Sequence, residues 1–299
     1  MDFTNFPRKN KTYAGANGSK ISVLLDGEQY MLKFPAAASR NREMSYANGC
    51  ISEYLGSQIF NITDISAQQT MLGTYRKNGK EKIVVACKDF TTPETVLQDF
   101  ASLKNTIIDS EHNGYGTEIS DILQTIDEQQ AIDSYKLKEH FWNMFIVDAF
   151  IGNWDRHNGN WGFLYNTRTD EIKLAPVYDC GSCLFPQADA EIMRATLASQ
   201  EERDIRTFKI PTSGIKQNGQ KINYFDFISS LEFPDCNEAL KRMLPRIDMA
   251  KINVLIDQTP YITDLQKEFY KTILRERKEK ILDKSLQLLR KKERENIIR

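Results

Sequence analysis

The run GNWDRHNGN at 152–160, followed by APVYDCG at 175–181, is the most informative part of this sequence. It places Asp155 and Asn160 five residues apart on what we expect to be one loop. A second carboxylate, Asp179, follows nineteen residues after Asn160. A structural loop would explain an Asp/Asn pair that stood alone, but the complete order with its glycines favours a functional site.

A β-hairpin is predicted between the two runs. Positions 161–165 and 172–175 have the composition of short strands, and 166–170 has that of a turn. The hairpin is expected to return Asp179 to the neighbourhood of Asn160, because antiparallel strands bring the two ends of a hairpin together. Two ligands of one metal require that proximity.

Phosphoryl transfer from ATP requires a set of side chains of this kind. One carboxylate orients the acceptor hydroxyl, while a carboxamide and another carboxylate hold Mg²⁺ against the phosphates. We therefore predict that Asp155 is catalytic and that Asn160 and Asp179 are metal ligands. His157 stands where an imidazole N–H could stabilise charge on the transferred phosphate. A histidine that only shapes the loop explains its position equally well.

The composition is that of an ordinary globular chain. It has 299 residues, 40% of them hydrophobic and 27% charged, enough for a sizeable core in two lobes or domains. The formal net charge of −1 gives no general attraction to nucleic acid, so we expect no stable nucleic-acid binding. No apolar run approaches the roughly twenty residues of a membrane span. The N-terminus lacks a secretory signal pattern, and we expect a cytoplasmic protein without a transmembrane segment.

The five cysteines are odd in number and scattered, which favours a reducing compartment over a disulfide framework. Cys180 and Cys183 form a CxxC pattern, but a zinc site would need a second pair or nearby histidines, and the chain has only three histidines. We therefore predict that these two cysteines act as small apolar side chains beside Asp179.

Strand patterns dominate residues 1–90. The dipeptide Asp26-Gly27 between two apolar runs is a strong hairpin signal. The segment 87–93 then has the composition of a crossing to a second lobe. The elements expected before the crossing are strands at 21–25, 29–34, 71–75 and 82–86 and a helix at 43–60.

From about position 94 the pattern is mostly helical. Positions 137–151 form the most apolar stretch, which predicts a buried helix that leads to Asp155. We predict an α+β, two-lobed fold like that of protein kinases, with a small β-rich N-terminal ATP-binding lobe at 1–90 and a larger, mainly helical catalytic lobe at 91–299. Further helices are expected at 247–256, 265–274 and 281–289.

The stretch YAGANGSK at 13–20 precedes the first strand of this lobe. Its residues Gly15, Asn17 and Gly18 could form a loop whose backbone N–H groups cover phosphates. Loops of this composition are more often simple turns, so this signal is weak when taken alone.

Lys33 stands in an apolar strand one hairpin after that loop. A kinase places there the lysine that grips the α- and β-phosphates. A strand lysine that points to solvent is the alternative. Glu53 on the following helix is the predicted ion-pair partner of Lys33, and Glu43 is the competing candidate.

The order of glycine loop, strand lysine, helix glutamate and DRHxxN resembles the HipA-like serine/threonine kinases, which are ATP-dependent bacterial protein kinases. The likeness runs through nearly the whole chain. The segments that carry it are GANGSKIS at 15–22, KFP at 33–35, NGCISEY at 48–54, IVVACKDF at 83–90, 155–163, 179–184, KINY at 221–224 and PRIDM at 245–249.

This resemblance implies ATP and Mg²⁺ as cofactors and a Ser or Thr hydroxyl of a protein as the acceptor. Position by position, it implies ATP phosphates at Lys33, the adenine edge at the backbone of Lys88, Asp89 and Phe90, catalysis at Asp155, and metal at Asn160 and Asp179.

The family resemblance also implies that the kinase phosphorylates its own glycine loop. Thr12, Ser19 and Ser22 are the hydroxyls in or next to this loop, and Thr12 is favoured because it immediately precedes 13–16. A phosphate there would add negative charge beside ATP and act as an off-switch.

HipA itself carries an additional N-terminal subdomain and works with a DNA-binding antitoxin. Because this chain begins close to the glycine loop, we expect neither that subdomain nor an antitoxin partner. The DRHxxN motif also resembles the catalytic loop of phosphoinositide kinases, so a lipid or small-molecule phosphotransferase is a second hypothesis. A kinase-like scaffold is the third, although all the residues of phosphotransfer are present.

The C-terminal stretch 265–299 is rich in Lys and Arg. Leu274, Ile281 and Leu288 recur every seven residues and predict one buried stripe along a helix. The helix is either part of the core with a solvated basic face or a docking surface for an acidic partner.

Overall fold

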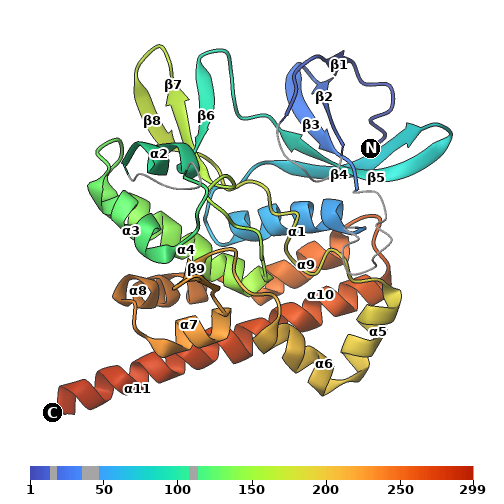
Figure 1. The fold of residues 1–299 in the computed structure, drawn as a ribbon. Coiled ribbons are helices and arrows are strands. Elements are labelled where there is room, and N and C mark those ends of the chain that lie inside the picture. The colour runs from blue at the N-terminus through green and yellow to red at the C-terminus, as the bar shows by residue number, and fades with distance from the viewer. Residues whose placement is uncertain (14–18, 36–46, 108–113, 299) are drawn as a thin grey trace.

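The computed structural model describes residues 1–13, 19–35, 47–107 and 114–298. An antiparallel sheet lies at the N-terminal end of the fold, and helices make up most of the opposite end (Figure 1). The sheet has the strand order β1-β2-β3-β5-β4. Its strands are β1 (Arg8–Lys9), β2 (Lys20–Leu25), β3 (Glu28–Lys33), β4 (Thr70–Lys77) and β5 (Lys80–Lys88).

Two-residue turns connect β2 to β3 and β4 to β5. Asp26 and Gly27 both have positive φ angles, 52° and 81°, and so do Asn78 and Gly79, at 53° and 73°. Turns with two positive φ values match the twist of the strands that they join, which explains why Asp-Gly and Asn-Gly occur here. The predicted hairpins at 21–34 and 71–86 are confirmed; β3 is shifted by one residue from its predicted bounds, and the other three strands are longer than expected.

Helix α1 (Gly49–Ile62) packs beneath the sheet against β4 and β5 (Figure 1). The first residues of the helix predicted at 43–60 lie outside the described part of the chain. One apolar cluster runs from this face of the sheet through α1 and into the helical part, and includes Val85, Leu55 and Phe145. The opposite face of the sheet packs on Phe3 and forms a cluster of its own.

A second sheet has the strand order β6-β7-β8, with strands β6 (Thr95–Asp99), β7 (Gly162–Asn166) and β8 (Glu171–Leu174). The predicted hairpin after the catalytic-loop motif is confirmed, with Phe163 opposite Leu174. β6 corrects our expectation for this segment, because we predicted mostly helix from position 94 onward. Its residues form a strand because they pair with β7 along their whole length, and this long-range pairing leaves no local signal.

Helices form the rest of the chain, apart from the short hairpin β9 (Lys216–Gln217) and β10 (Gln220–Lys221). The predicted buried helix is α4, and no helix among the described residues is long and apolar enough to span a membrane. The helices are α2 (Phe100–Ile107), α3 (Ile119–Glu128), α4 (Ser134–Ile151), α5 (Ala190–Ala198), α6 (Gln200–Asp204), α7 (Tyr224–Ser230), α8 (Pro234–Met243), α9 (Met249–Gln258), α10 (Asp264–Arg277) and α11 (Lys284–Ile298), with shorter turns at η2 (Ile205–Lys209), η3 (Leu244–Arg246) and η4 (Lys278–Asp283).

The seven-residue stripe predicted near the C-terminus holds for only part of its length. Leu274 and Ile281 are fully buried, whereas Leu288 is only half-buried. The π-helix η4 between α10 and α11 contains more residues per turn than an α-helix. It therefore rotates the buried face, and Leu286 and Leu289 enter the core in place of Leu288. Beyond Leu289 the side chains of α11 are exposed, and the helix extends past the body (Figure 1).

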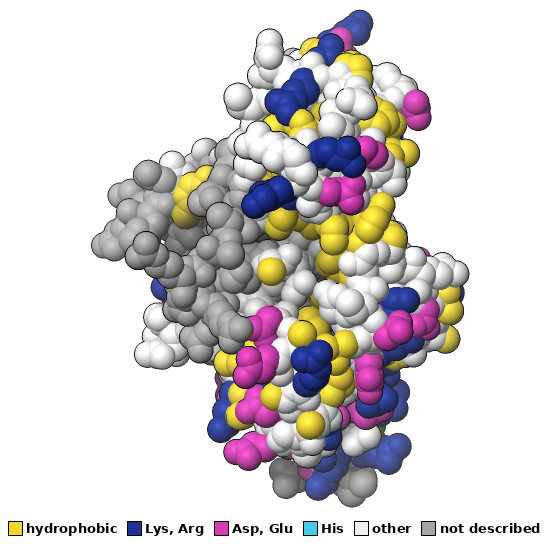
Figure 2. Space-filling view, turned by 90° about the vertical axis from the view of Figure 1, so that its right-hand side faces the viewer, with side chains coloured by type: hydrophobic (Ala, Val, Ile, Leu, Met, Phe, Trp, Pro, Cys, Tyr) yellow, Lys and Arg dark blue, Asp and Glu magenta, His cyan; other side chains and the backbone are white. Residues whose placement is uncertain are grey.

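All five cysteines are buried with free thiols, which agrees with the predicted apolar role of Cys180 and Cys183. The surface of the described residues carries charges of both signs. On the face in Figure 2, Lys and Arg side chains lie among Asp and Glu, and neither sign covers it alone. This distribution fits the net charge of −1.

Arg277 of α10 is a buried cation that joins three elements by hydrogen bonds. Its exposed fraction is 0%. Nε and Nη2 donate to the Ala149 carbonyl at 2.9 and 2.7 Å, and Nη1 donates to the carbonyls of Arg206 and Thr207. Burial lowers the pKa of Arg277 to about 10. The guanidinium thus satisfies one carbonyl in the last turn of α4, where carbonyls lack partners within the helix, and two carbonyls of η2.

We predict that Arg277→Met lowers the free energy of unfolding by about 3 kcal/mol, because it leaves buried carbonyls without a donor. Arg275 lies two positions earlier on the same helix and is exposed. The matched variant Arg275→Met is expected to change the free energy by less than about 0.5 kcal/mol. Urea unfolding of both variants measures the difference, and equal effects would contradict this role of Arg277.

Candidate active site

A cavity of about 630 Å³ lies between the first sheet, α1 and the catalytic-loop run 155–160. It collects side chains from segments that are far apart in the sequence. Eight predicted site residues line it: Lys33, Glu53, Asp89, Phe90, Asp155, His157, Asn160 and Asp179. Gly15, Asn17 and Gly18 lie outside the described residues, and Lys88 is not among the residues that line the cavity.

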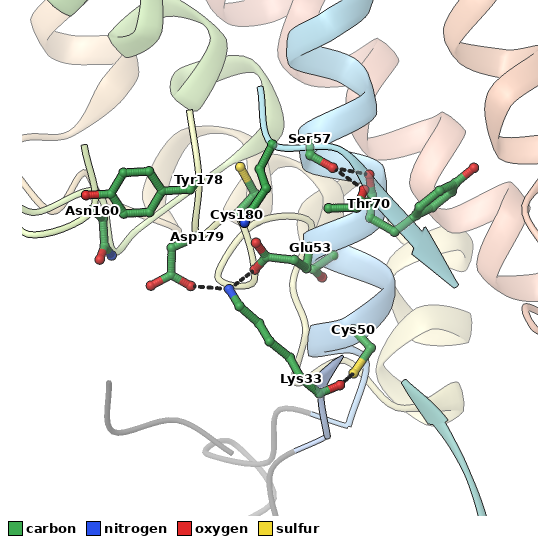
Figure 3. A network of polar contacts seen from close by, with 12 residues as sticks. Lys33, Cys50, Glu53, Ser57, Thr70, Asn160, Tyr178, Asp179 and Cys180 are labelled. Carbon is green, nitrogen blue, oxygen red and sulfur yellow. Dashed lines mark hydrogen bonds and ion pairs between the residues drawn. The ribbon is translucent and has the colours of Figure 1, made fainter. Parts of the chain in front are cut away.

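Lys33 points into the cavity, so the solvent-facing alternative is wrong. Its Nζ lies 2.9 Å from Glu53 Oε2 and 2.9 Å from Asp179 Oδ1 (Figure 3). Glu53 is the partner that we predicted, and the competing Glu43 lies outside the described residues. The Glu53 side chain is 2% exposed, and within the described chain its carboxylate makes no hydrogen bond. Lys33 is therefore the group that compensates this buried charge.

Two opposing effects act on the charge of Lys33. Burial alone would lower its pKa, but the carboxylates of Asp179 and Glu53 together raise the pKa well above its ordinary value. Reciprocally, Lys33 lowers the pKa of Asp179 to about 2. Lys33 and Asp179 are therefore both charged at neutral pH, and the lysine is held between Asp179 and Glu53.

Asn160 is oriented by the backbone of its own loop. Its Nδ2 donates to the Asp155 carbonyl at 2.8 Å, and Oδ1 has no partner among the described residues. The amide oxygen is therefore free to act as a ligand or acceptor. Asn160 and Asp179 point to the same side of the site (Figure 3). This is the proximity that the predicted hairpin required.

The Asp155 carboxylate lines the cavity and makes no hydrogen bond or ion pair with the described residues. Burial raises its pKa above the ordinary value of 3.8. His157 opposes that increase, and the nearby Asp179 carboxylate adds to it. An unpaired carboxylate that prefers to gain a proton is suited to accept one from a hydroxyl group.

His157 shapes its own loop, and its ring also faces the cavity. The Gly159 amide donates to its Nδ1 at 3.0 Å, so the ring shapes the loop. Because Nδ1 is the acceptor, the proton of the neutral ring is assigned to Nε2. The ring also lines the cavity and lies 6.4 Å from the Tyr115 ring. Its second nitrogen thus remains available as a donor.

The segment 88–91 crosses from the first sheet toward β6, and its backbone corrects one expectation. The Lys88 amide donates to the Gln69 carbonyl, the Lys88 carbonyl accepts from Gln68, and the Asp89 amide donates to Gln29. These groups hold the fold together. The Asp89 carbonyl and the Phe90 N–H make no hydrogen bond within the described chain. They are the two sides of one trans peptide unit and point in opposite directions, so only one of them can face a ligand in the cavity.

The Asp89 side chain also has a role that the sequence did not reveal. It is 5% exposed and lies 2.6 Å from Lys11 Nζ. It also accepts hydrogen bonds from Tyr13 at 2.8 Å and from Thr91 at 2.7 Å. This carboxylate anchors residues 11–13, the segment that leads into 14–18, to the crossing. Lys88 instead directs its side chain to Glu28 on the surface.

Sequence reasoning missed the buried ion pair between Asp148 and Arg156. Arg156 Nε lies 2.9 Å from Asp148 Oδ2, and the two side chains are 2% and 1% exposed. Arg156 Nη1 donates to the Asn160 and Tyr178 carbonyls at 2.7 and 2.6 Å. A signal was present, because Asp148 is the one charged residue within the apolar run 141–151.

The metal ligands predicted for this site are one carboxylate, Asp179, and one amide oxygen, that of Asn160. Among the described residues there is no group of three or more His, Cys, Asp or Glu side chains that could hold a metal. A protein-only metal cage is therefore absent from the described chain. Mg²⁺ commonly binds through one or two protein oxygens and completes its shell with phosphates and water, so this donor set fits Mg²⁺.

Comparison with known proteins places the chain in a family. Residues 11–250 match the family described as HipA-like C-terminal domain. The chain is 49% identical over 274 residues to the serine/threonine-protein kinase CtkA of Helicobacter pylori strain J99, covering 91% of this chain and 83% of that protein.

Solved structures agree with that assignment. The crystal structure of a Helicobacter pylori proinflammatory kinase, CtkA, is similar with a TM-score of 0.90 at 48% identity, and 96% of each chain is covered. The Shewanella oneidensis MR-1 HipA, from a complex with HipB and operator DNA, is similar with a TM-score of 0.52 at 14% identity. That likeness covers 94% of this chain and 67% of the other, and it shows a shared fold alone.

The extent of the family match and the identity to CtkA lead to one conclusion. This chain is a kinase that belongs to the family of the HipA-like C-terminal domain.

Proposed function

We propose that this chain is an ATP- and Mg²⁺-dependent serine/threonine protein kinase that transfers the γ-phosphate of ATP to protein hydroxyls. The observation that carries this proposal is the convergence of Lys33, Asp155, Asn160 and Asp179 on one cavity. The name of the 49% identical relative supports the serine/threonine acceptor.

The cavity offers separate places for the base and for the phosphates of ATP. Phe90 and Tyr178 lie with ring centroids 5.9 Å apart at the crossing, beside the free Asp89 carbonyl and Phe90 amide. A purine placed there would lie against these rings and form one hydrogen bond with the Asp89-Phe90 peptide unit, on the side that faces the cavity. Lys33, held by Glu53 and Asp179, would meet the phosphates as a fixed positive charge.

The Asn160 amide oxygen and the Asp179 carboxylate are the groups that would hold Mg²⁺. When bound, the cation neutralises charge on the phosphates. Asp155 would orient the acceptor hydroxyl and accept its proton, since its carboxylate is unpaired within the described chain. The Nε2–H of His157 would donate to the transferred group. Arg156 holds the carbonyl of Asn160 and that of Tyr178, the residue before Asp179, so it would keep both proposed metal ligands in place.

Radiolabelled ATP tests the function and its acceptor. The purified protein is incubated with Mg²⁺ and labelled ATP, with a cell lysate in one arm and lipid vesicles in the other. Labelled protein bands that contain phosphoserine or phosphothreonine support the proposal. Labelled lipid would instead indicate the phosphoinositide-type reaction, and no transfer would indicate a scaffold. An Asp155→Asn protein run in parallel separates transfer by this chain from transfer by a contaminant.

We predict opposite effects of the two site carboxylates on stability. Asp155→Asn and Asp179→Asn should both abolish transfer. Because burial disfavours the Asp155 carboxylate, Asp155→Asn should raise the melting temperature, by about 2 °C. Asp179→Asn should lower the melting temperature, because Lys33 loses a partner. Differential scanning calorimetry measures both, and a loss of stability in Asp155→Asn would contradict this account.

The stabilisation by Asp179 should depend on pH. Its pKa is lowered from 3.8 to about 2 in the folded state, so its contribution is present above 3.8 and is lost as the pH falls toward 2. The difference in unfolding free energy between wild type and Asp179→Asn should therefore be complete at about pH 5 and smaller at about pH 3. Urea unfolding at the two pH values checks this.

We predict that the loss of Lys33 has separable effects on stability and catalysis. Lys33→Met should lower the free energy of unfolding by about 3 kcal/mol, because it leaves Glu53 buried without a counter-charge. The double variant Lys33→Met/Glu53→Gln should recover much of that stability and remain inactive. A double variant that recovers activity together with stability would show that Lys33 has no role in phosphate binding.

We also propose autophosphorylation, and the structure of the segment favours one residue. Thr12 is exposed and lines the cavity, whereas Ser22 lies on β2 with an exposed fraction of 1%. Ser19 is exposed but is not among the lining residues. We expect phosphate on Thr12 after incubation with Mg-ATP, and a weaker affinity for ATP as a result. Mass spectrometry locates the phosphate, and Thr12→Ala should lose it while Ser22→Ala retains it.

A further inference from the structure

Asn48 links the start of α1 to two other parts of the fold. Its backbone amide donates to the Pro186 carbonyl at 2.9 Å. Its Nδ2 donates to the Ala188 carbonyl at 2.7 Å, and its Oδ1 accepts from Gln266 at 3.1 Å. Pro186 and Ala188 belong to the segment 180–188 that follows Asp179, and Gln266 is on α10. One side chain therefore joins α1 to both.

The position of Asn48 in the helix makes these contacts informative. It is the N-cap residue of α1, where an Asn side chain ordinarily accepts a hydrogen bond from the first turn of its own helix. Here the side chain makes no such cap. Both ends of its amide are directed to other elements instead. The residue thus serves the position of the helix in the fold and not the formation of the helix.

One face of α1 packs against the segment 180–188 along several turns. A Cβ atom on Gly56 would lie 2.7 Å from Cys180 Cβ and 2.9 Å from Cys183 Sγ, so the backbones approach as closely as a glycine allows. The Cys183 thiol also donates to the Ser52 carbonyl at 3.3 Å. Glu53, the partner of Lys33, is on this same face, and a Cβ on Gly181 would lie 3.1 Å from its Oε2.

The segment 180–188 is itself held rigidly. Cys180, Cys183 and Leu184 are each 0% exposed, and Phe185 is 3% exposed. The Leu184 amide donates to the Ile151 carbonyl at the end of α4 at 2.9 Å. Gln266, the other anchor, is held by the capping box of α10, in which its side chain accepts from the Thr263 amide. Asn48 therefore fastens α1 to two elements that are already fixed.

We propose that Asn48 is a positioning residue that clamps α1 to the segment 180–188 and to α10, and so keeps Glu53 in contact with Lys33. The inference rests on the proposed kinase function, because it assigns to the clamp the alignment of the lysine that meets the phosphates. An enzyme built in this way needs no phosphorylation of the segment after Asp179 to assemble its ion pair. Phosphorylation elsewhere, as on Thr12, would act on a site that is already assembled.

Two substitutions at Asn48 separate clamping from capping. Asn48→Ala removes both side-chain contacts. Asn48→Asp is isosteric and caps a helix as well as Asn does, but it cannot donate to the Ala188 carbonyl. We expect both variants to lower kcat roughly tenfold. Hydrogen–deuterium exchange in peptides from 49–62 should rise in both variants, while peptides from α4 exchange as in the wild type.

The matched control is Asn61→Ala. Asn61 is at the other end of α1, where its Oδ1 accepts from the Ala67 amide at 2.9 Å, away from the segment 180–188. This variant should keep the wild-type kcat. Wild-type kcat in Asn48→Asp would show that the hydrogen bond from Asn48 to the Ala188 carbonyl does not affect catalysis and would overturn the proposal. Unchanged exchange of 49–62 in both Asn48 variants would do the same.

The exchange measurement also distinguishes failure of the clamp from failure of the proposed function. If the wild type transfers no phosphate, the kinase proposal fails, yet faster exchange of α1 in Asn48→Asp still supports the clamp. If the wild type is active and Asn48→Asp matches it in both measurements, the clamp fails and the kinase proposal stands. Asn48→Asp keeps the size of the native residue and is a residue type that can cap a helix, so the comparison remains possible if Asn48→Ala does not fold.

Discussion

The buried ion pair between Asp148 and Arg156 is the interaction on which the site depends. Two charges in the interior are costly unless their hydrogen bonds are satisfied. Here Asp148 accepts from Arg156 and from Asn153 Nδ2 at 2.8 Å, and the guanidinium uses its remaining donors on backbone carbonyls. Those carbonyls belong to Asn160 and Tyr178, so one side chain holds the loop that carries Asp155 beside the residue that precedes Asp179.

A chain of contacts extends this constraint to the first sheet. Arg156 Nη2 lies 3.6 Å from Cys180 Sγ, and Cys180 packs against Gly56 of α1. Helix α1 carries Glu53, which pairs with Lys33 on β3. The catalytic loop and the strand lysine are therefore related through packed side chains and not only through a bound nucleotide. A shift in any of these contacts would displace the residues that form the others, because close-packed interiors transmit strain.

The sequence was informative where chemistry or a turn is encoded locally. Asp26-Gly27 predicted its hairpin because the positive φ values of the turn restrict the residue types. The motif around Asp155 predicted its loop because phosphoryl transfer requires these residue types in this order. Features that depend on distant partners were missed. β6 forms a strand because it pairs with β7. The rotation of the buried face before Leu286 comes from a π-helix that the spacing of apolar residues does not predict. The Lys88 backbone groups were misassigned because only the fold shows that they are already paired.

The charged side chains of the site lower the stability of the fold and are also the groups that the proposed reaction uses. Asp155 and Asp179 are like charges in a partly buried cavity, and Lys33 compensates Asp179 and Glu53 but leaves Asp155 unpaired. The burial that raises the pKa of Asp155 disfavours the carboxylate at neutral pH, so the fold must supply that free energy from elsewhere. In the proposed enzyme an acceptor hydroxyl would donate a hydrogen bond to Asp155 and so stabilise its carboxylate. Lys33 would then pair with the phosphates of ATP in place of Asp179, and Asp179 would pair with Mg²⁺ in place of Lys33. The ion pairs of Lys33 are thus the contacts that ATP and Mg²⁺ would replace.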